Sequence, residues 1–394
     1  TAYEISLGLV GSEMCIRDSV LGVFIPPIYQ TAIFEQPDKE TLSTRLSDRG
    51  VDLKYSREEN PTVRCLERVL SKLELGEDAL AFSSGMAAIS ALYLALLKKD
   101  SKIILSKEAY GTTIQLAKEL SKFSVEVILA GPDTEDFIDK ICTHNRIALV
   151  LVETITNPTL RVPDVREIIK VCKESNIMIA IDNTFATPIL YNPLSDGANI
   201  VIHSLTKYIA GHNDVIAGAI VSNRVLIKDL LWDWRRRLGS ILDPHVAYLV
   251  LRGVKTLHVR FERQSRSAME IAKYLQEHPK VVKVYYPGLP DDPCHSVAKR
   301  LFKVRLYGGV VSFKIRGGRS EVFRFMRSLN IIKCSPSLGG TESLISYPVI
   351  SAAKTMEPSL RRELGITDNL LRLSVGLEDV EDLIEDLGKA LSNI

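Results

Sequence analysis

A lysine with two hydroxyl side chains close by directly follows an apolar segment of this chain. Ile200 to Ile202 reads as a short buried strand, and Ser204, Thr206 and Lys207 come soon after it. An ammonium group that is desolvated at a strand end loses its charge and becomes a nucleophile. Amine nucleophiles form Schiff bases with carbonyls, and pyridoxal 5'-phosphate (PLP) is the commonest carbonyl cofactor that uses a lysine. For Lys207 taken alone, a solvated lysine at the start of a helix is at least as good an interpretation.

An aspartate follows the preceding apolar run in the same way. Ile177 to Ile181 is continuously apolar, which is typical of a parallel strand covered on both faces, and Asp182 comes next. Ligands of open α/β sheets bind at the carboxyl ends of strands, so we expect Asp182 to face the crevice. There a carboxylate can keep the pyridine nitrogen of PLP protonated through a charged hydrogen bond of about 1.5–3 kcal/mol. A lone aspartate after a strand is more often a turn or cap residue, but the pair with Lys207 is much more specific.

The segment around the lysine resembles the motif of a known family. It reads Ser204-Leu-Thr-Lys-Tyr-Ile-Ala-Gly-His-Asn-Asp214, which is similar to the lysine motif of the PLP-dependent enzymes of cysteine and methionine metabolism. This trans-sulfuration family includes cystathionine γ-synthase, cystathionine γ-lyase, cystathionine β-lyase and methionine γ-lyase. The resemblance extends from about Pro26 to the C-terminus. It implies that PLP is the cofactor, that amino acids are the substrates, and that Lys207 and Asp182 are catalytic.

Two polar stretches match cofactor contacts of the family. The resemblance implies that Tyr55 and Arg57 reach the PLP phosphate of a neighbouring subunit, whereas without it a polar turn is the better interpretation. Ser84, Gly85 and Met86 open a predicted helix, whose free N–H groups make an anion site, although Ser-Gly is also a common helix cap. The resemblance adds three further cofactor-binding residues, which are Thr184, Ser204 and Thr206.

Two side chains that follow other predicted strands complete the expected cofactor site. The family places a tyrosine at Tyr110, where its ring stacks on the pyridine and its phenol can assist proton transfer. A tyrosine that covers a core is the alternative. Asn157 matches the family's asparagine near the PLP 3-oxygen and the substrate carboxylate. Glu153 lies where the family has an acidic residue close to the ring.

An arginine inside an apolar strand is the main candidate for binding substrate. Arg372 lies within the predicted strand Leu370 to Val375, and an unpaired buried arginine is costly, so it needs an anion. An internal salt bridge is the alternative. The resemblance makes Arg372 the clamp for the substrate α-carboxylate, together with Ser337 and Asn157. Ser337 belongs to a glycine-rich loop that matches the family's Ser-Leu-Gly-Gly-x-Glu-Ser-Leu.

The composition restricts the class of protein. The chain has 394 residues, of which 46% are hydrophobic and 25% charged, as expected for a globular protein with a large core. A net charge of +2 is too balanced to suggest nucleic acid or a membrane surface as a partner. The six cysteines are scattered without Cys-x-x-Cys spacing, so we expect no metal site and free thiols in a reducing cytoplasm. No apolar run approaches the roughly 18 residues of a membrane span, and no secretory signal is recognisable.

Apolar runs alternate with helical patterns through the first two thirds of the chain, which predicts a parallel sheet with crossover helices. We expect the PLP-dependent transferase fold of type I, with a large, mostly parallel α/β domain and a smaller C-terminal α+β domain. The expected parts are an N-terminal arm at 1–50, a PLP-binding α/β domain at 51–245 and a C-terminal α+β domain at 246–394. Residues 1–19 lack periodicity and resemblance to the family, so we expect them to be non-native and to add little to the fold.

A stretch after Gly218 combines Trp232 and Trp234 with the three arginines at 235–237. Aromatic and basic residues together can bind nucleic acid. Because Asp233 lies among them and the protein is nearly neutral, we expect a solvated helix face instead.

The residue before Ser337 bears on the choice of reaction. Many γ-lyases and bacterial γ-synthases of the family have a glutamate there, which can receive the distal amino group of cystathionine, whereas this chain has Pro336. Plant-type γ-synthases resemble the chain in this respect, so the cystathionine γ-synthase reaction is favoured. The alternatives are γ-elimination by a cystathionine γ-lyase or methionine γ-lyase, an O-acylhomoserine sulfhydrylase, and a PLP-binding regulatory protein without turnover. The resemblance also implies a homo-oligomer, a dimer of dimers with active sites shared between subunits.

Overall fold

The computed structural model describes residues 25–36 and 46–394. The segment 1–19, which we expected to add little to the fold, lies outside these residues, as does part of the predicted arm at 1–50. Within the described residues, no helix is both long and apolar enough to cross a membrane.

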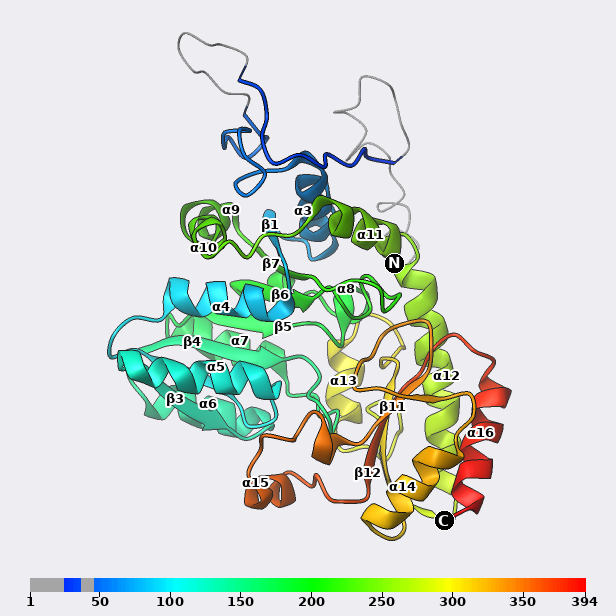
Figure 1. Ribbon diagram of the computed structural model, residues 1–394. Coiled ribbons are helices and arrows are strands. Elements are labelled where there is room, and N and C mark those ends of the chain that lie inside the picture. Colours follow the sequence, from blue (N-terminus) through cyan, green and yellow to red (C-terminus); the bar gives the residue numbers. More distant parts are fainter. Residues whose placement is uncertain (1–24, 37–45) are drawn as a thin grey trace.

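A seven-stranded sheet forms the centre of the larger lobe (Figure 1). Its order is β1-β7-β6-β5-β4-β2-β3, and all neighbours are parallel except that β7 runs antiparallel to both β1 and β6. The strands are β1 (Asp78–Phe82), β2 (Lys102–Ser106), β3 (Glu126–Ala130), β4 (Ile147–Glu153), β5 (Ile179–Asp182), β6 (Ile200–Ser204) and β7 (Gly218–Ser222). The mostly parallel sheet was predicted, but β7 was not.

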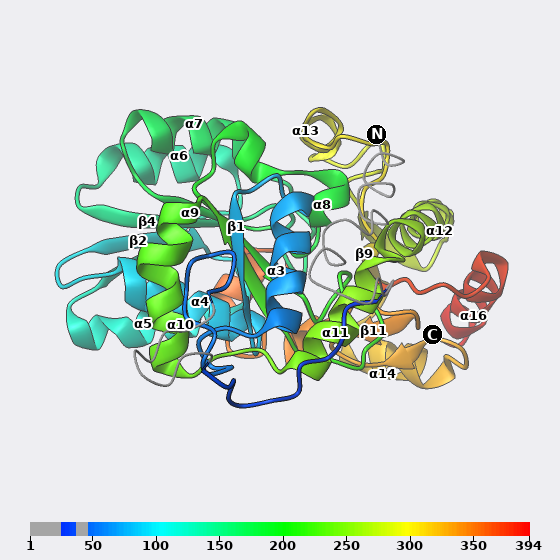
Figure 2. The same cartoon turned by 90° about the horizontal axis from the view of Figure 1, so that it is seen from above.

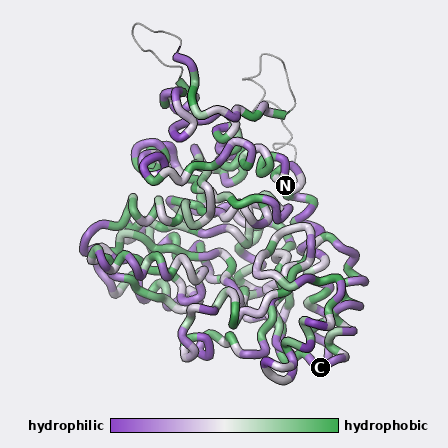
Figure 3. The backbone as a smooth tube through the Cα atoms, viewed as in Figure 1, coloured by the Kyte–Doolittle hydropathy of each residue, from purple (hydrophilic) through white to green (hydrophobic). Residues whose placement is uncertain are grey.

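Helices cover both faces of this sheet because its strands are apolar on both sides. In β2, Ile103 and Leu105 pack with one set of helices, and Ile104, which points the other way, packs with the other set. Figure 2 shows the two layers, and the strand region is mainly hydrophobic in Figure 3. One layer contains α4 (Gly85–Leu96), α5 (Gly111–Glu119) and α10 (Trp232–Leu238); the other contains α6 (Thr134–Thr143) and α7 (Val165–Glu174).

A five-stranded sheet forms the smaller lobe, in the order β10-β11-β12-β9-β8. Its strands are β8 (Val281–Tyr285), β9 (Val310–Ile315), β10 (Lys333–Cys334), β11 (Leu344–Ser346) and β12 (Leu370–Ser374), and its long helices are α12 (Leu257–Glu277), α14 (Arg319–Ser328) and α16 (Val380–Ser392). The sequence predicted β8, β9 and β12 at these places, but not the short β10 and β11. All five strands come after residue 245, although the domain boundary itself stays a prediction.

The remaining helices connect and flank these two sheets. The helix α3 begins where the Asn60 side chain accepts hydrogen bonds from the N–H groups of Thr62 and Val63. The helices that connect and flank the sheets are α3 (Pro61–Leu73), η1 (Leu120–Phe123), α8 (Thr187–Leu190), η2 (Pro193–Asp196), α9 (Arg224–Leu226), η3 (Ile227–Leu231), α11 (Pro244–Val254), α13 (His295–Leu301), η4 (Pro348–Ile350) and α15 (Pro358–Glu363).

The expected solvated helix face at 235–237 is wrong for its first arginine. Arg235 is 3% exposed and donates hydrogen bonds to the Glu67 carboxylate and to the Glu58 carbonyl oxygen. Arg236 and Arg237 do pair with Asp233 near the surface. Arg235 is buried because a carboxylate on α3 compensates its charge, which a local sequence pattern cannot show.

The cysteines follow the expectation of free thiols only in part. Cys142, Cys172, Cys294 and Cys334 are free. Cys65 is disulfide-bonded, so the expectation is wrong for this residue.

Candidate active site

The loop after β6 places Lys207 between the two lobes. Its Nζ donates a hydrogen bond to Ser337 Oγ at 3.2 Å, which links the large sheet to the glycine-rich loop of the smaller lobe. Burial, assisted by the positive charge of Arg372, lowers the pKa of Lys207 to about 8. An amine with this pKa is partly neutral at physiological pH, so it can attack a carbonyl carbon.

Asp182 lies at the end of β5, beside the strand that leads to Lys207. Its Oδ1 accepts hydrogen bonds from the Thr184 N–H at 3.0 Å and from the Thr184 hydroxyl at 2.6 Å. Thr184 Oγ1 in turn accepts from the Ser204 N–H at 2.9 Å. No described residue hydrogen-bonds to Asp182 Oδ2, and burial raises the pKa of this carboxyl. A cationic N–H placed against Oδ2 would restore the carboxylate form.

The N-terminus of α4 packs directly on the strand ends next to Lys207. The Ser84 hydroxyl caps the helix by accepting a hydrogen bond from the Ala87 N–H at 3.0 Å. A Cβ at Gly85 would lie 3.1 Å from the Ser204 Cβ, and a Cβ at Gly218 would lie 2.2 Å from the Ser84 carbonyl oxygen. Glycine therefore allows the close approach that brings the free N–H groups of the helix start to the crevice, where they suit a phosphate.

The hydroxyls of Thr206 and Ser204, near Lys207, differ in the hydrogen bonds that they form. Thr206 Oγ1 accepts a hydrogen bond from the Ala217 N–H at 3.0 Å and donates to the Ala217 carbonyl oxygen at 3.2 Å, so it stabilises the turn. Within the described residues, Ser204 Oγ has no hydrogen-bond partner. The Ser204 hydroxyl is therefore free to donate to a ligand, whereas Thr206 would have to exchange the Ala217 carbonyl oxygen for the ligand as its acceptor.

Tyr110 and Glu153 meet at the start of α5. The Tyr110 side chain is 49% exposed, and its backbone N–H donates to Glu153 Oε1 at 2.8 Å. The adjacent Met86, on α4, accepts a weak hydrogen bond from the Thr113 hydroxyl at its sulfur. The tyrosine ring is thus free of the core, which argues against the alternative that it only covers a core.

Arg372 on β12 is buried without a carboxylate partner in the described part of the chain. Its Nη1 donates to Asn157 Oδ1 at 2.9 Å, and its Nη2 donates to the carbonyl oxygens of Pro336 at 2.7 Å and Ser337 at 3.1 Å. Its Nε has no hydrogen-bond partner. Burial lowers the pKa of Arg372 to about 10. The described residues therefore do not form the internal salt bridge that was the alternative for Arg372. An external anion could accept a hydrogen bond from its vacant Nε.

Tyr55 and Arg57 are not brought to this group of residues within one chain. The Arg57 guanidinium lies over the Tyr55 ring, 4.8 Å from its centroid, and the ring is 39% exposed. No hydrogen bond joins either residue to any described residue around Lys207. Their segment lies near α3 and α10, on the other side of the large lobe from β12 (Figure 1).

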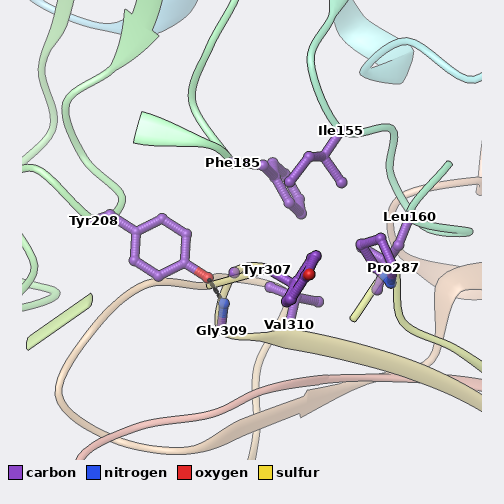
Figure 4. Close-up of a pocket in the computed structure, with 9 residues that line it drawn as sticks. Ile155, Leu160, Phe185, Tyr208, Pro287, Tyr307, Gly309 and Val310 are labelled. Atoms are coloured by element: carbon purple, nitrogen blue, oxygen red, sulfur yellow. Dashed lines mark hydrogen bonds between the residues drawn. The ribbon is translucent and has the colours of Figure 1, made fainter. Parts of the chain in front are cut away.

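A small cavity next to this site is a packing feature and not a substrate pocket. It measures about 10 Å³ and is lined mainly by apolar side chains, among them Phe185, Tyr208 and Tyr307 (Figure 4). This volume holds about one water molecule. The buried Tyr208 hydroxyl accepts a hydrogen bond from the Gly309 N–H at 3.2 Å, so the residue after Lys207 anchors its loop to the smaller lobe.

Sequence reasoning missed one carboxylate that orders the loops of the site. Glu108 is fully buried and accepts hydrogen bonds from the hydroxyls of Thr156 at 2.7 Å and Thr159 at 2.6 Å. It thereby ties the loop that carries Tyr110 to the loop that carries Asn157. In the sequence, the only indication of this role was that Glu108 lies two positions before Tyr110. An acidic residue at such a place usually lies at the surface.

The residues of the crevice fit PLP well. They supply a half-buried lysine of lowered pKa, a carboxyl oxygen without a partner for the ring nitrogen, and a helix N-terminus for the phosphate.

Comparisons with known proteins agree with this fit. Residues 13–392 match the model of a family described as Cys/Met metabolism PLP-dependent enzyme, a match that also overlaps the end of the segment 1–19. An L-methionine gamma-lyase of Fusobacterium nucleatum subsp. polymorphum is 38% identical and covers 98% of each chain. A cystathionine gamma-lyase of Bacillus subtilis (strain 168) is 37% identical and covers 96% of each chain.

Among solved structures, the chain is similar to a cystathionine gamma synthase from Xanthomonas oryzae pv. oryzae, in complex with aminoacrylate and cysteine. The TM-score is 0.92 at 35% identity, over 99% of this chain and 98% of that chain. The predicted type I fold and the predicted cofactor are thereby confirmed, and the alternative of a regulatory protein without turnover is set aside. The chain belongs to the Cys/Met metabolism PLP-dependent enzymes, and it is an enzyme that forms or cleaves C–S bonds.

Proposed function

We propose that the enzyme catalyses γ-replacement, in which an activated homoserine ester and cysteine give cystathionine. The observation that carries this choice is the position of Pro336. Arg372 Nη2 donates to the Pro336 carbonyl oxygen at 2.7 Å, so residue 336 lies beside the proposed carboxylate clamp. Proline offers no charge to the distal ammonium group of cystathionine. A missing charged contact of about 1.5–3 kcal/mol weakens selection for cystathionine as a substrate by roughly ten- to a hundredfold.

In this proposal the lysine and the aspartate have complementary roles. Bound PLP supplies an electron sink for a carbanion at the substrate Cα. Lys207 would hold the cofactor and would move protons at the substrate Cα and Cβ. Asp182 would keep the pyridine nitrogen protonated through its vacant Oδ2, and Thr184 orients the carboxylate. Tyr110 would help to hold the pyridine ring.

The substrate carboxylate binds to Arg372, which has a vacant Nε, with Ser337 and Asn157 beside it. A carboxylate would supply the negative charge that is missing around this buried guanidinium. The contact also holds the reacting Cα close to Lys207, because Ser337 is the residue that Lys207 contacts.

The phosphate group binds to the start of α4, at the N–H groups of Gly85 and Met86, with Ser84, Ser204 and Thr206 around it. Tyr55 and Arg57 of a second copy of the chain complete this site in a homo-oligomer, a dimer of dimers. The support for this step is that one chain leaves both residues exposed and away from Lys207. A cytoplasmic location stays a prediction.

Two experiments test the proposal. Purified enzyme with PLP should form cystathionine from an O-acylhomoserine and cysteine faster than it cleaves cystathionine to cysteine and 2-oxobutanoate. Faster cleavage would favour a cystathionine γ-lyase. Rapid release of methanethiol from methionine would favour a methionine γ-lyase, and preferential use of sulfide would favour a sulfhydrylase.

The second experiment addresses the shared site. Arg57→Ala and Lys207→Ala variants, each inactive, should regain activity when their subunits exchange. Failure to regain activity, with exchange shown by mass spectrometry, would contradict a site built from two copies.

A further inference from the structure

Glu153, at the end of β4, is a buried acid that the proposed reaction does not use. Its side chain is 7% exposed, and Oε1 accepts the hydrogen bond from the Tyr110 N–H at 2.8 Å. Oε2 is buried and has no hydrogen-bond partner among the described residues. An ionised oxygen without a partner is far costlier to bury than a neutral hydroxyl.

The charged groups that act on Glu153 are both acids, Asp182 and Glu108. Its ladder partner on β5 is Asp182, and paired residues on parallel strands point to the same face about 4.8 Å apart. The charge of Glu108, in the loop before α5, also acts on Glu153. Burial, together with the charges of Asp182 and Glu153, raises the pKa of the Tyr93 phenol of α4. No described lysine or arginine forms an ion pair with Glu153. Burial and the charge of Asp182 raise the pKa of Glu153 well above its ordinary value.

The two carboxyls differ in the hydrogen bonds they receive. Asp182 accepts two, both from Thr184, and these stabilise its anion. From the residues that the structure describes, Glu153 accepts only one, from a backbone N–H. When two adjacent buried acids hold one negative charge, the charge stays where more donors point.

We propose that Glu153 is a positioning residue that remains protonated in the working enzyme, so that it fixes the backbone of Tyr110 while Asp182 alone carries the negative charge. This inference rests on the proposed roles of Tyr110 and Asp182. A charged Glu153 would compete with Asp182 for the protonated pyridine nitrogen and would place a second unpaired anion in the crevice. The neutral acid keeps the acceptor for Tyr110 without adding a charge.

The test compares two substitutions. In Glu153→Gln the side chain is a neutral isostere of the protonated acid and keeps an oxygen for the Tyr110 N–H. In Glu153→Asp the acid is kept but is one methylene shorter, which withdraws the acceptor. The first measurement is an infrared difference spectrum of the PLP-bound proteins at neutral pH, wild type minus Glu153→Gln. It should contain the carbonyl band of a protonated carboxylic acid.

The second measurement is the visible absorbance of the bound cofactor as a function of pH. The Kd for PLP is measured for the same proteins. Glu153→Gln should reproduce the wild-type titration curve, and Glu153→Asp should bind PLP about tenfold more weakly, as expected for the loss of one hydrogen bond. Thermal melting of both variants controls for folding.

Absence of the acid band, or a displaced titration curve in Glu153→Gln, would overturn the inference, because either would mean that Glu153 is ionised. Wild-type affinity in Glu153→Asp would overturn the positioning role. The infrared result does not depend on turnover. If wild-type enzyme failed to make cystathionine, the proposed function would fail while this measurement still decided the state of Glu153.

Discussion

Two regions of the molecule bury arginines in opposite ways. Between α3, β1 and α10, three arginines are interleaved with three carboxylates; we call this set the paired cluster, and it consists of Arg49, Arg64, Arg235, Glu59, Glu67 and Asp78. Among the described residues, Arg372 in the crevice donates only to carbonyl and amide oxygens, and its Nε has no hydrogen-bond partner.

The electrostatic consequences of the two arrangements are also opposite. Although burial lowers the pKa of Arg49, the surrounding carboxylates outweigh this effect and raise the pKa above its ordinary value. Burial lowers the pKa of Arg372 to about 10, and no carboxylate of the described segments offsets this effect. A buried charge that the chain itself compensates stabilises structure, whereas one left uncompensated marks the place of a charged ligand.

The largest effect is expected from removing the nucleophile of the crevice. Lys207→Ala should lower activity by several orders of magnitude, because no other described lysine contacts Ser337 in its place. Borohydride reduction should fix PLP on Lys207 in the wild type, and peptide mapping should find no such label in the variant. A label on another lysine of the wild-type enzyme would contradict the assignment.

Matched substitutions at Arg49 and Arg372 test whether the chain itself compensates each buried charge. Arg49→Met should destabilise the fold by about 3–5 kcal/mol, because it leaves carboxylates buried without their cation. Arg372→Met removes a guanidinium that lacks a counter-charge, so the midpoint of urea unfolding of the cofactor-free protein should stay the same or rise. Its kcat/KM should nevertheless fall by about a hundredfold or more, as expected when a buried charge pair with the substrate is lost. Equal destabilisation by both variants would contradict the difference in charge compensation between Arg49 and Arg372.

The sequence predicted the crevice better than the paired cluster. The positions of Asp182 and Lys207 near strand ends could be predicted, because each comes soon after an apolar run and strand ends follow from local patterns. Their roles stay proposals. Arg235 looked solvated because its partner Glu67 is remote in the sequence. The same reason applies to Arg49, whose three carboxylate partners come from three different segments.

The missed strand β7 has a similar explanation. Gly218 to Ser222 is short and lies next to an amphipathic stretch, so its local pattern did not identify it. It is a strand because it inserts antiparallel between β1 and β6, which are far apart in the sequence. Glu108 and the vacant oxygen of Glu153 likewise depend on contacts between loops, which periodicity does not report.

The uncompensated charges of the crevice also predict a pH dependence. Burial and Arg372 lower the pKa of Lys207 to about 8, and only the neutral amine attacks PLP. The rate at which PLP attaches to the cofactor-free protein should therefore rise about tenfold per pH unit below this pKa and level off above it. Stopped-flow absorbance measures this rate. In Arg372→Met, where the nearby positive charge is gone, the plateau should begin at a higher pH; an unchanged profile would show that Arg372 does not act on Lys207.

The smallest effect is expected from placing a carboxylate at residue 336, where the chain has a proline. Pro336 is exposed, and its carbonyl oxygen is fixed by Arg372, so a side chain at this position can be changed without disturbing the buried contacts. Pro336→Glu would offer a carboxylate to the distal ammonium group of cystathionine, and kcat/KM for cystathionine cleavage should rise roughly ten- to a hundredfold. Pro336→Gln is the matched control, because it has the same length without the charge and should raise this value far less. The gain of the glutamate should also shrink at high salt, since an exposed ion pair is screened. Equal gains in both variants would mean that loop shape and not charge selects the substrate, and the argument for γ-replacement from Pro336 would then fail.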